Sequence, residues 1–197
     1  MQKLLKPEVQ QFIRTYSEDL SKLAFSGSPF KDITVQELIQ QIKSRRKAEK
    51  KLPTWFSTEA ILYPPKLNLE QTSSEATATY KASLVSGESI ADLTGGFGVD
   101  SHSFANTFKK VYYFEINKEL SELAKHNFEI LTLKNIDVTH ANGVEVIKNR
   151  KYDVIYMDPS RRNEAKGKVF FLSDCEPNVP KHLDTFFESA PTLLIKT

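Results

Sequence analysis

Cysteine is nearly absent from this chain of 197 residues, which contains Cys175 alone. A single cysteine excludes an internal disulfide and is typical of proteins in the reducing cytoplasm, which is the location we predict. The four histidines, at positions 102, 126, 140 and 182, lack the spacing of metal ligands. We therefore expect neither a structural zinc site nor any other metal among the site residues.

Long apolar runs are also missing. No stretch reaches the roughly 18 apolar residues that predict a membrane-spanning helix, and the segment Met1 to Pro7 has no apolar core of a signal peptide. The net charge of +2 excludes a polycation, and the apolar fraction of 40% is enough for a real hydrophobic core. These values predict one domain of ordinary size, or a small domain with an appendage.

Positive charge is nevertheless concentrated in one segment, between residues 43 and 51. Its cations are Lys43, Arg45, Arg46, Lys47, Lys50 and Lys51. Such a cluster can contact phosphates without reading a sequence. It can equally be a solvated helix end, where cations complement the helix dipole. The sequence leaves both interpretations open.

Helical signals dominate the first half of the chain. Pro7 suits a first helical position, and Thr34 with Glu37 predicts a capping box for a second helix that ends before Pro53. Residues 54–71, rich in proline, predict an extended connection. Thr72 with Glu75 predicts a capping box for a helix that runs to about residue 85. We expect a helical region over 1–53, and a connection with a helix before the first strand over 54–87.

The pattern changes at residue 88 to short apolar runs that alternate with helical ones. Strands are predicted over 89–93, 110–115, 136–139, 154–157 and 192–196, and helices over 118–131 and 143–149. This alternation predicts an α/β domain over 88–197, with a Rossmann-like, doubly wound and mainly parallel sheet.

Three motifs follow these strands. Asp92 to Gly98 forms a glycine turn, which predicts a nucleotide-sized pocket at the carboxyl edge of the sheet, although glycine can serve turn geometry alone. Glu115 ends the next strand, 23 positions after Asp92, where a carboxylate can accept hydrogen bonds from ribose hydroxyls. Asp158-Pro159 follows the strand over 154–157 and reaches the same edge.

In this order the motifs resemble those of class I S-adenosylmethionine-dependent methyltransferases. The turn is similar to their Asp-x-Gly-x-Gly-x-Gly pattern, with Thr94 in place of one glycine, and the resemblance covers roughly residues 70–197. The segments 62–65, 70–75 and 80–82 resemble a bacterial group in which a helical start precedes the methyltransferase domain and a THUMP-like, RNA-associated domain follows. The domain is also similar to RNA cap guanine-N2 methyltransferases. These likenesses imply RNA as the substrate.

The resemblance implies S-adenosyl-L-methionine as the cofactor and assigns residues to its parts. Asp92 would anchor the loop or meet the methionine ammonium through water. The remaining contacts are implied for Thr94, Gly95, Gly96 and Gly98 (amino acid end), Glu115 (ribose), and Ile116 and Asn142 (adenine). Lys81 could reach the cofactor carboxylate, but exposure to solvent is the preferred interpretation for it.

Asp158 is the predicted catalytic residue, together with Pro159 and Arg161. A carboxylate, with a carbonyl held outward by proline, can accept the two N–H groups of a base amino group and localise its lone pair. Amino methyltransferases of this family continue with a second proline and an aromatic, where this chain has Ser160 and Arg161. Arg161 could stack on a base or grip a phosphate, or pair with a surface acid such as Asp174.

We therefore predict methyl transfer to a base nitrogen of RNA. A small-molecule methyltransferase and a non-catalytic cofactor- or RNA-binding module stay as alternatives. A full class I sheet has more strands than the sequence offers, so we also predict an incomplete fold. The chain would then lack a C-terminal domain or borrow the surface of a partner chain.

Overall fold

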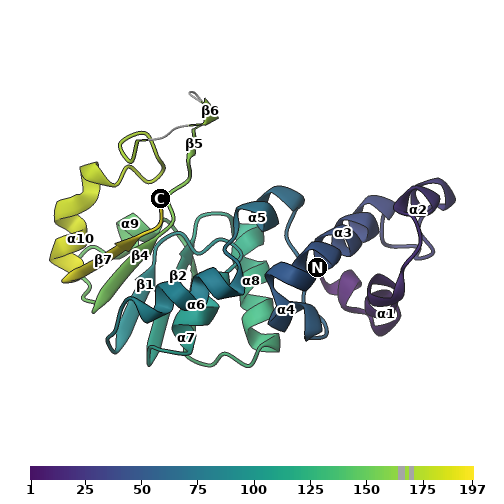
Figure 1. Ribbon diagram of the computed structural model, residues 1–197, viewed down its shortest axis with the longest axis horizontal. Coiled ribbons are helices and arrows are strands. Elements are labelled where there is room, and N and C mark those ends of the chain that lie inside the picture. Colours follow the sequence, from purple (N-terminus) through teal and green to yellow (C-terminus); the bar gives the residue numbers. More distant parts are fainter. Residues whose placement is uncertain (164–166, 169–170) are drawn as a thin grey trace.

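A five-stranded parallel sheet forms one end of the molecule, in the strand order β3-β2-β1-β4-β7 (Figure 1). The strands are β1 (Ser89–Asp92), β2 (Lys110–Glu115), β3 (Ile136–His140), β4 (Val154–Met157) and β7 (Thr192–Ile195). The computed structural model describes residues 1–163, 167, 168 and 171–197. All five predicted strands are confirmed, with ends that differ by no more than one residue. The strand order reverses between β1 and β4, where ligands bind in open α/β sheets.

Helices cover both faces of this sheet, so the predicted doubly wound architecture is confirmed. On one face α6 (Glu75–Ser83), α7 (Val99–Ala105) and α8 (Lys118–Ile130) pack over alternate strand residues such as Ile90 and Tyr113. On the other face α9 (Gly143–Val146) and α10 (Leu183–Ser189) pack over the residues in between, such as Ala91 and Ile155. Strands covered on both faces need apolar residues at every position, which these sequences supply.

The N-terminal region is helical, as predicted, and lies at the far end of the molecule from β7 (Figure 1). It contains η1 (Gln2–Leu5), α1 (Pro7–Thr15), α2 (Leu20–Ser26) and α3 (Val35–Lys51). The capping box is confirmed, because Glu37 N donates to Thr34 Oγ1 at 3.2 Å and Thr34 N donates to Glu37 Oε2 at 2.9 Å. These helices enclose their own apolar cluster around Val9, Leu38 and Ile42.

The extended connection predicted over 54–71 is wrong, since two short helices lie there: α4 (Pro53–Ser57) and α5 (Lys66–Gln71). Pro53 opens α4 at a position where the missing N–H costs nothing. The predicted cap of α6 is also wrong, because Ser74 and not Thr72 caps it. Glu75 instead accepts from Thr54 N at 2.9 Å and so caps α4.

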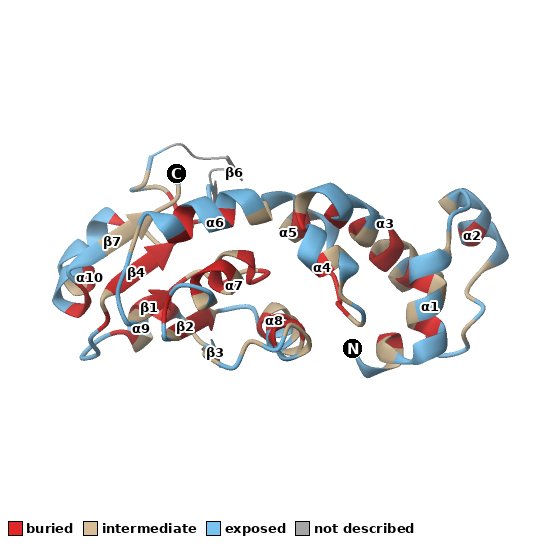
Figure 2. Cartoon of the chain, turned by 60° about the horizontal axis from the view of Figure 1, so that its bottom comes forward, coloured by how far each residue is buried: buried red, intermediate tan, exposed pale blue. Residues whose placement is uncertain are grey.

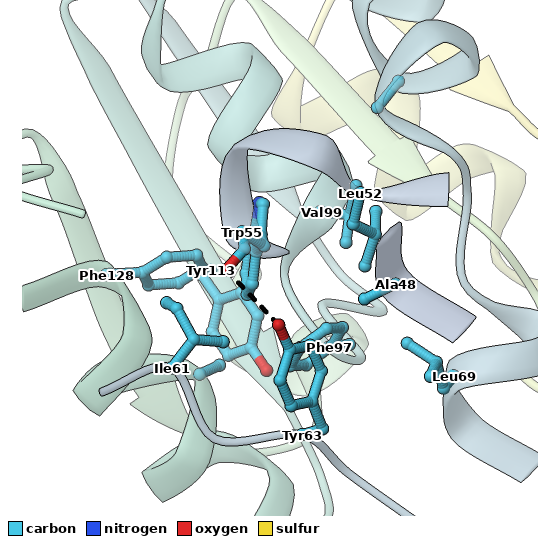
Figure 3. Close-up of a cluster of buried hydrophobic side chains, with 12 residues drawn as sticks. Ala48, Leu52, Trp55, Ile61, Tyr63, Leu69, Phe97, Val99, Tyr113 and Phe128 are labelled. Atoms are coloured by element: carbon cyan, nitrogen blue, oxygen red, sulfur yellow. Dashed lines mark hydrogen bonds between the residues drawn. The ribbon is translucent and has the colours of Figure 1, made fainter. Parts of the chain in front are cut away.

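A second apolar cluster joins the helical region to the sheet. Trp55 and Tyr63 lie in it beside Phe97, which comes from the glycine loop (Figure 3). Figure 2 shows the same division, with buried residues concentrated in the strands and on the inward sides of the helices. The glycine loop is therefore supported from behind by residues far away in the sequence.

The chain between β4 and β7 contains elements that the sequence did not predict. These are β5 (Arg162–Asn163), β6 (Gly167–Lys168), η2 (Pro180–His182) and α10. None of the helices in the described part of the chain has the length and apolar composition that crossing a membrane requires.

Candidate functional site

A cavity of about 1030 Å³ opens at the carboxyl ends of β1, β2 and β4. Its walls come from the glycine loop, the end of β2, the start of α9, the segment after β4, the loop over 173–178 and α5. Six of the predicted site residues lie in the glycine loop, at Glu115 or directly after β4, so strand order brings the three motifs to one cavity. The position is the topological switch point of the sheet.

The glycines of the loop have different physical reasons. A Cβ at Gly95 would lie 2.1 Å from the Tyr113 ring, and one at Gly98 would lie 2.4 Å from Phe128 Cζ. Packing from behind the loop therefore requires both residues. Gly96 has a φ of +57° and faces open space. Gly95 and Gly96 line the cavity, but the structure does not bring Gly98 to its wall.

Asp92 lies behind the loop and also stays out of the cavity wall. Its carboxylate accepts from Ser101 Oγ at 2.6 Å and from Thr94 N at 3.1 Å, and the residue is 1% exposed. Burial raises the pKa of Asp92 to about 7. This geometry fits the predicted anchoring of the loop and leaves no access to a ligand.

Thr94 connects two of the three motifs. Its Oγ1 accepts a hydrogen bond from the backbone N–H of Asp158 at 2.7 Å. A glycine at this position could not make that contact, so the departure from the family pattern has a structural consequence. Sequence analysis assigned Thr94 to the cofactor only and missed this link.

Glu115 lies in the cavity wall and binds the glycine loop. Its Oε2 accepts from Gly96 N at 2.8 Å, and its Oε1 accepts from Asn117 N at 2.7 Å. Each carboxylate oxygen can accept a second hydrogen bond, so capacity for ribose hydroxyls remains. Ile116 follows with a side chain that is 70% exposed in the same wall, as an adenine-stacking residue would be.

Asn142 lines the cavity at the start of α9. Its Oδ1 caps that helix by accepting from Val144 N at 3.1 Å, which leaves the amide N–H groups for a ligand. Gly143 follows, and a Cβ there would lie 2.8 Å from Leu93 Cα. The sequence analysis did not single out Gly143, although close packing against β1 requires a glycine.

Asp158 forms an ion pair with Lys196 across the two neighbouring strands β4 and β7. Lys196 Nζ lies 2.5 Å from Asp158 Oδ2, and both side chains are partly exposed in the cavity wall. Lys196 was missed as a site residue. The signal was present, because Lys196 ends the predicted strand over 192–196 and parallel strands end at one edge.

Pro159 and Arg161 also line the cavity. Between them the backbone of Ser160 pairs with Glu176, with Ser160 N donating to Glu176 O at 2.7 Å and Glu176 N to Ser160 O at 3.1 Å. The segment after β4 is thereby fixed to the loop over 173–178. The exposed Arg161 stands where amino methyltransferases have an aromatic.

A buried polar network lies beside the glycine loop. Lys81 Nζ lies 2.5 Å from Asp100 Oδ1 and donates to Ser73 Oγ and Tyr156 Oη, both at 2.8 Å. Tyr156 and Ser73 in turn donate to Asp100 Oδ2 at 2.8 and 3.0 Å. The preferred interpretation of Lys81 as a solvent-exposed residue is wrong, because its side chain is 8% exposed.

The basic cluster over 43–51 is largely used within the fold. Lys51 Nζ donates to the Leu69 and Glu70 carbonyls at the end of α5, and Lys47 pairs with Glu70. Arg46 donates to carbonyls near α2, and the Arg45 guanidinium lies over the Phe56 ring. These contacts favour the structural interpretation of the cluster over phosphate binding.

Comparisons with known proteins give a consistent result for this part of the chain. A family model described as "RNA cap guanine-N2 methyltransferase" matches residues 87–161. An uncharacterized RNA methyltransferase of Mycoplasma mobile is 28% identical over 92 residues, which are 46% of this chain and 25% of that protein.

Solved structures agree with the fold. A "putative methyltransferase" from Porphyromonas gingivalis W83 superposes with a TM-score of 0.71 and 27% identity, over 94% of this chain and 47% of that chain. A "putative RNA methyltransferase" from Pyrococcus horikoshii superposes with a TM-score of 0.50 and 20% identity, over 72% of this chain and 69% of that one, which shows the fold alone. The chain thus spans about half of the P. gingivalis protein and a quarter of the M. mobile protein. Fold, motif order and these likenesses identify residues 89–195 as a domain of the class I methyltransferase type.

Proposed function

We propose that the cavity binds S-adenosyl-L-methionine and that the chain takes part in methyl transfer to a base nitrogen of RNA. The observation that carries the proposal is the charge of the cavity wall. Seven carboxylates line it (Glu70, Asp100, Glu115, Glu145, Asp158, Asp174 and Glu176), against three cations (Arg161, Lys181 and Lys196). A wall of this charge favours a ligand with a cationic centre and disfavours the pyrophosphate of a dinucleotide.

The residues present also fit the other parts of this cofactor. Glu115 offers hydrogen-bond acceptors for ribose hydroxyls at the end of β2, and Ile116 offers an exposed apolar face for adenine. Gly96 leaves its side of the loop open. The cavity volume of about 1030 Å³ is at the upper end for a single small ligand, which leaves room for part of a substrate.

The chemistry of transfer needs a positioned nitrogen. When bound, the cofactor supplies a methyl group activated by a sulfonium. Asp158 would accept an N–H of the substrate amino group, which localises the nitrogen lone pair toward that methyl. Thr94 fixes the backbone of Asp158, and Lys196 holds one of its carboxylate oxygens. The roles of these residues are proposals.

RNA as the substrate rests on the similarity to RNA methyltransferases. Arg161 and Lys181 at the cavity wall add cations that a phosphate could use. A substrate in which only one base enters the cavity would keep its phosphates away from the acidic interior. A small-molecule substrate and a non-catalytic binding module are the alternatives that the experiment below separates. The cytoplasmic location stays a prediction.

The test has two parts. Calorimetric titration with S-adenosylmethionine and S-adenosylhomocysteine should show one site, which E115A weakens and E122Q, an exposed acid on α8, leaves intact. NAD⁺ should give no heat. Incubation of the protein with labelled cofactor and total RNA should then label RNA, and nuclease digestion with mass spectrometry should find a methylated base.

Each outcome has a defined meaning. Cofactor binding without label in any RNA would contradict RNA methylation and favour one of the alternatives, and label in small metabolites would identify the small-molecule enzyme. A folded protein that binds neither cofactor form would refute the proposal as a whole.

A further inference from the structure

Two aspartates lie near the glycine loop, and only one of them faces the cavity. Asp92 is enclosed by Ser101 and the backbone of Thr94, and it does not line the cavity. Asp100 does line the cavity, with a side chain that is 12% exposed. An ammonium group of a ligand beside the glycine loop can therefore reach Asp100 but not Asp92.

The buried network holds Asp100 in a fixed orientation. Three donors from three different elements reach its carboxylate: Lys81 from α6, Tyr156 from β4, and Ser73 from the segment before α6. Asp100 Oδ1 has the Lys81 ammonium as its only assigned neighbour among the described residues, and it accepts no further hydrogen bond there. One acceptor site on Oδ1 is therefore left over, on a carboxylate that cannot rotate away.

Lys81 itself is not available to a ligand. Its ammonium has three N–H groups, and Asp100, Ser73 and Tyr156 take all three. It also does not line the cavity. The pair is thus oriented, with the lysine in the interior and the carboxylate toward the cavity, so that its negative end meets a ligand.

We propose that Asp100 binds the ammonium of the amino acid end of S-adenosylmethionine, and that Lys81, Tyr156 and Ser73 are positioning residues for it. This inference rests on the proposed function and deepens it. It replaces the expectation that Asp92 meets this ammonium. The carboxylates elsewhere in the wall are engaged differently, since Glu115 binds Gly96 N and Glu70 pairs with Lys47.

The proposal predicts a loss of affinity that depends on the part of the ligand removed. A charge-assisted hydrogen bond contributes about 1.5–3 kcal/mol, so D100N should weaken binding of S-adenosylhomocysteine by about tenfold or more. Decarboxylated S-adenosylmethionine keeps the ammonium, so D100N should weaken its binding similarly. Methylthioadenosine lacks the whole amino acid end, and its affinity should stay within about twofold.

Controls separate this role from a structural one. D137N makes the same exchange at an exposed position on β3, paired with Lys110, and should change no affinity. If D100N folds poorly because Lys81 loses its counterion, the double variant K81M/D100N removes both buried charges and should show the same ligand dependence. Y156F, which removes one donor to Asp100, should weaken S-adenosylhomocysteine and spare methylthioadenosine.

Two results would overturn the inference while leaving the proposed function in place. One is an equal loss of affinity for S-adenosylhomocysteine and methylthioadenosine in D100N, which indicates a distorted cavity. The other is unchanged affinity for all three ligands. A wild-type protein that binds none of the three would instead refute the proposed function, and this inference with it.

Discussion

The ammonium of Lys196 lies 2.5 Å from Asp158 Oδ2, and the two residues end neighbouring parallel strands. The pair fixes the carboxylate that we assign to the substrate amino group. Since Lys196 holds one oxygen, the other is left to face a substrate. The free energy of this contact is therefore expressed in catalysis more than in folding, because both side chains are partly exposed.

Replacing Lys196 should lower the rate of transfer and not the affinity for cofactor. We expect K196M to reduce kcat about 10- to 100-fold, since Asp158 loses its fixed orientation. K196R should restore part of the rate, because a guanidinium can hold the same oxygen. Single-turnover methyl transfer, with cofactor affinity measured in parallel, checks this. A loss confined to cofactor affinity would contradict the assigned role.

Thr94→Val should separate the Thr94 hydroxyl from its shape. The variant keeps the branched side chain and removes the acceptor for Asp158 N, which costs about 1–3 kcal/mol when a buried donor is left unpaired. For a chain of this length that corresponds to a fall in Tm of roughly 2–12 °C. Thr94→Ser keeps the hydroxyl and serves as the control. Equal melting temperatures for T94V and wild type would show that the contact contributes nothing.

The contact between Trp55 and His102 predicts a pH-dependent stability. Trp55 Nε1 donates to His102 Nδ1 at 3.0 Å, which requires the neutral ring, and burial lowers the pKa of His102 below its ordinary value. The unfolded chain then binds a proton at higher pH than the folded one. This contribution to the free energy of unfolding is present above about pH 6.5 and is lost as pH falls below it.

Asp92 acts in the opposite direction, because its pKa is raised to about 7 and its protonation below that pH favours the folded state. The test is therefore a comparison of wild type with H102Q between pH 7.5 and 5. The wild type should lose more stability than H102Q on acidification. Trp55 is the only tryptophan, so its fluorescence reports the transition directly. A greater loss in H102Q would contradict the assignment.

Much of the sheet domain could be predicted from the sequence, because its strands are continuous apolar runs and its motifs follow them in order. Glu115 and Asp158 reached one cavity since parallel strands all end at the same edge. Lys196 was missed because β7 is distant from β4 in the sequence and adjacent to it only in the sheet.

Tertiary contacts explain the remaining differences. The short helices α4 and α5 are too short to be stable alone. Glu75 caps α4 from another helix, and Lys51 caps the end of α5 with bonds to two carbonyls. Lys81 was assigned to solvent because a lysine on a helix is usually exposed, and its partner Asp100 comes from a different helix. No local pattern announces such a pair.

Calorimetric titration of S-adenosylhomocysteine into the wild-type chain and into E115A tests the central claim most directly. We predict one binding site in the wild type and at least about tenfold weaker binding in E115A, since the proposed ribose contact is lost. Circular dichroism should show that both proteins are folded. A folded wild-type protein that gives no binding heat, or equal affinity in the two proteins, would contradict the account.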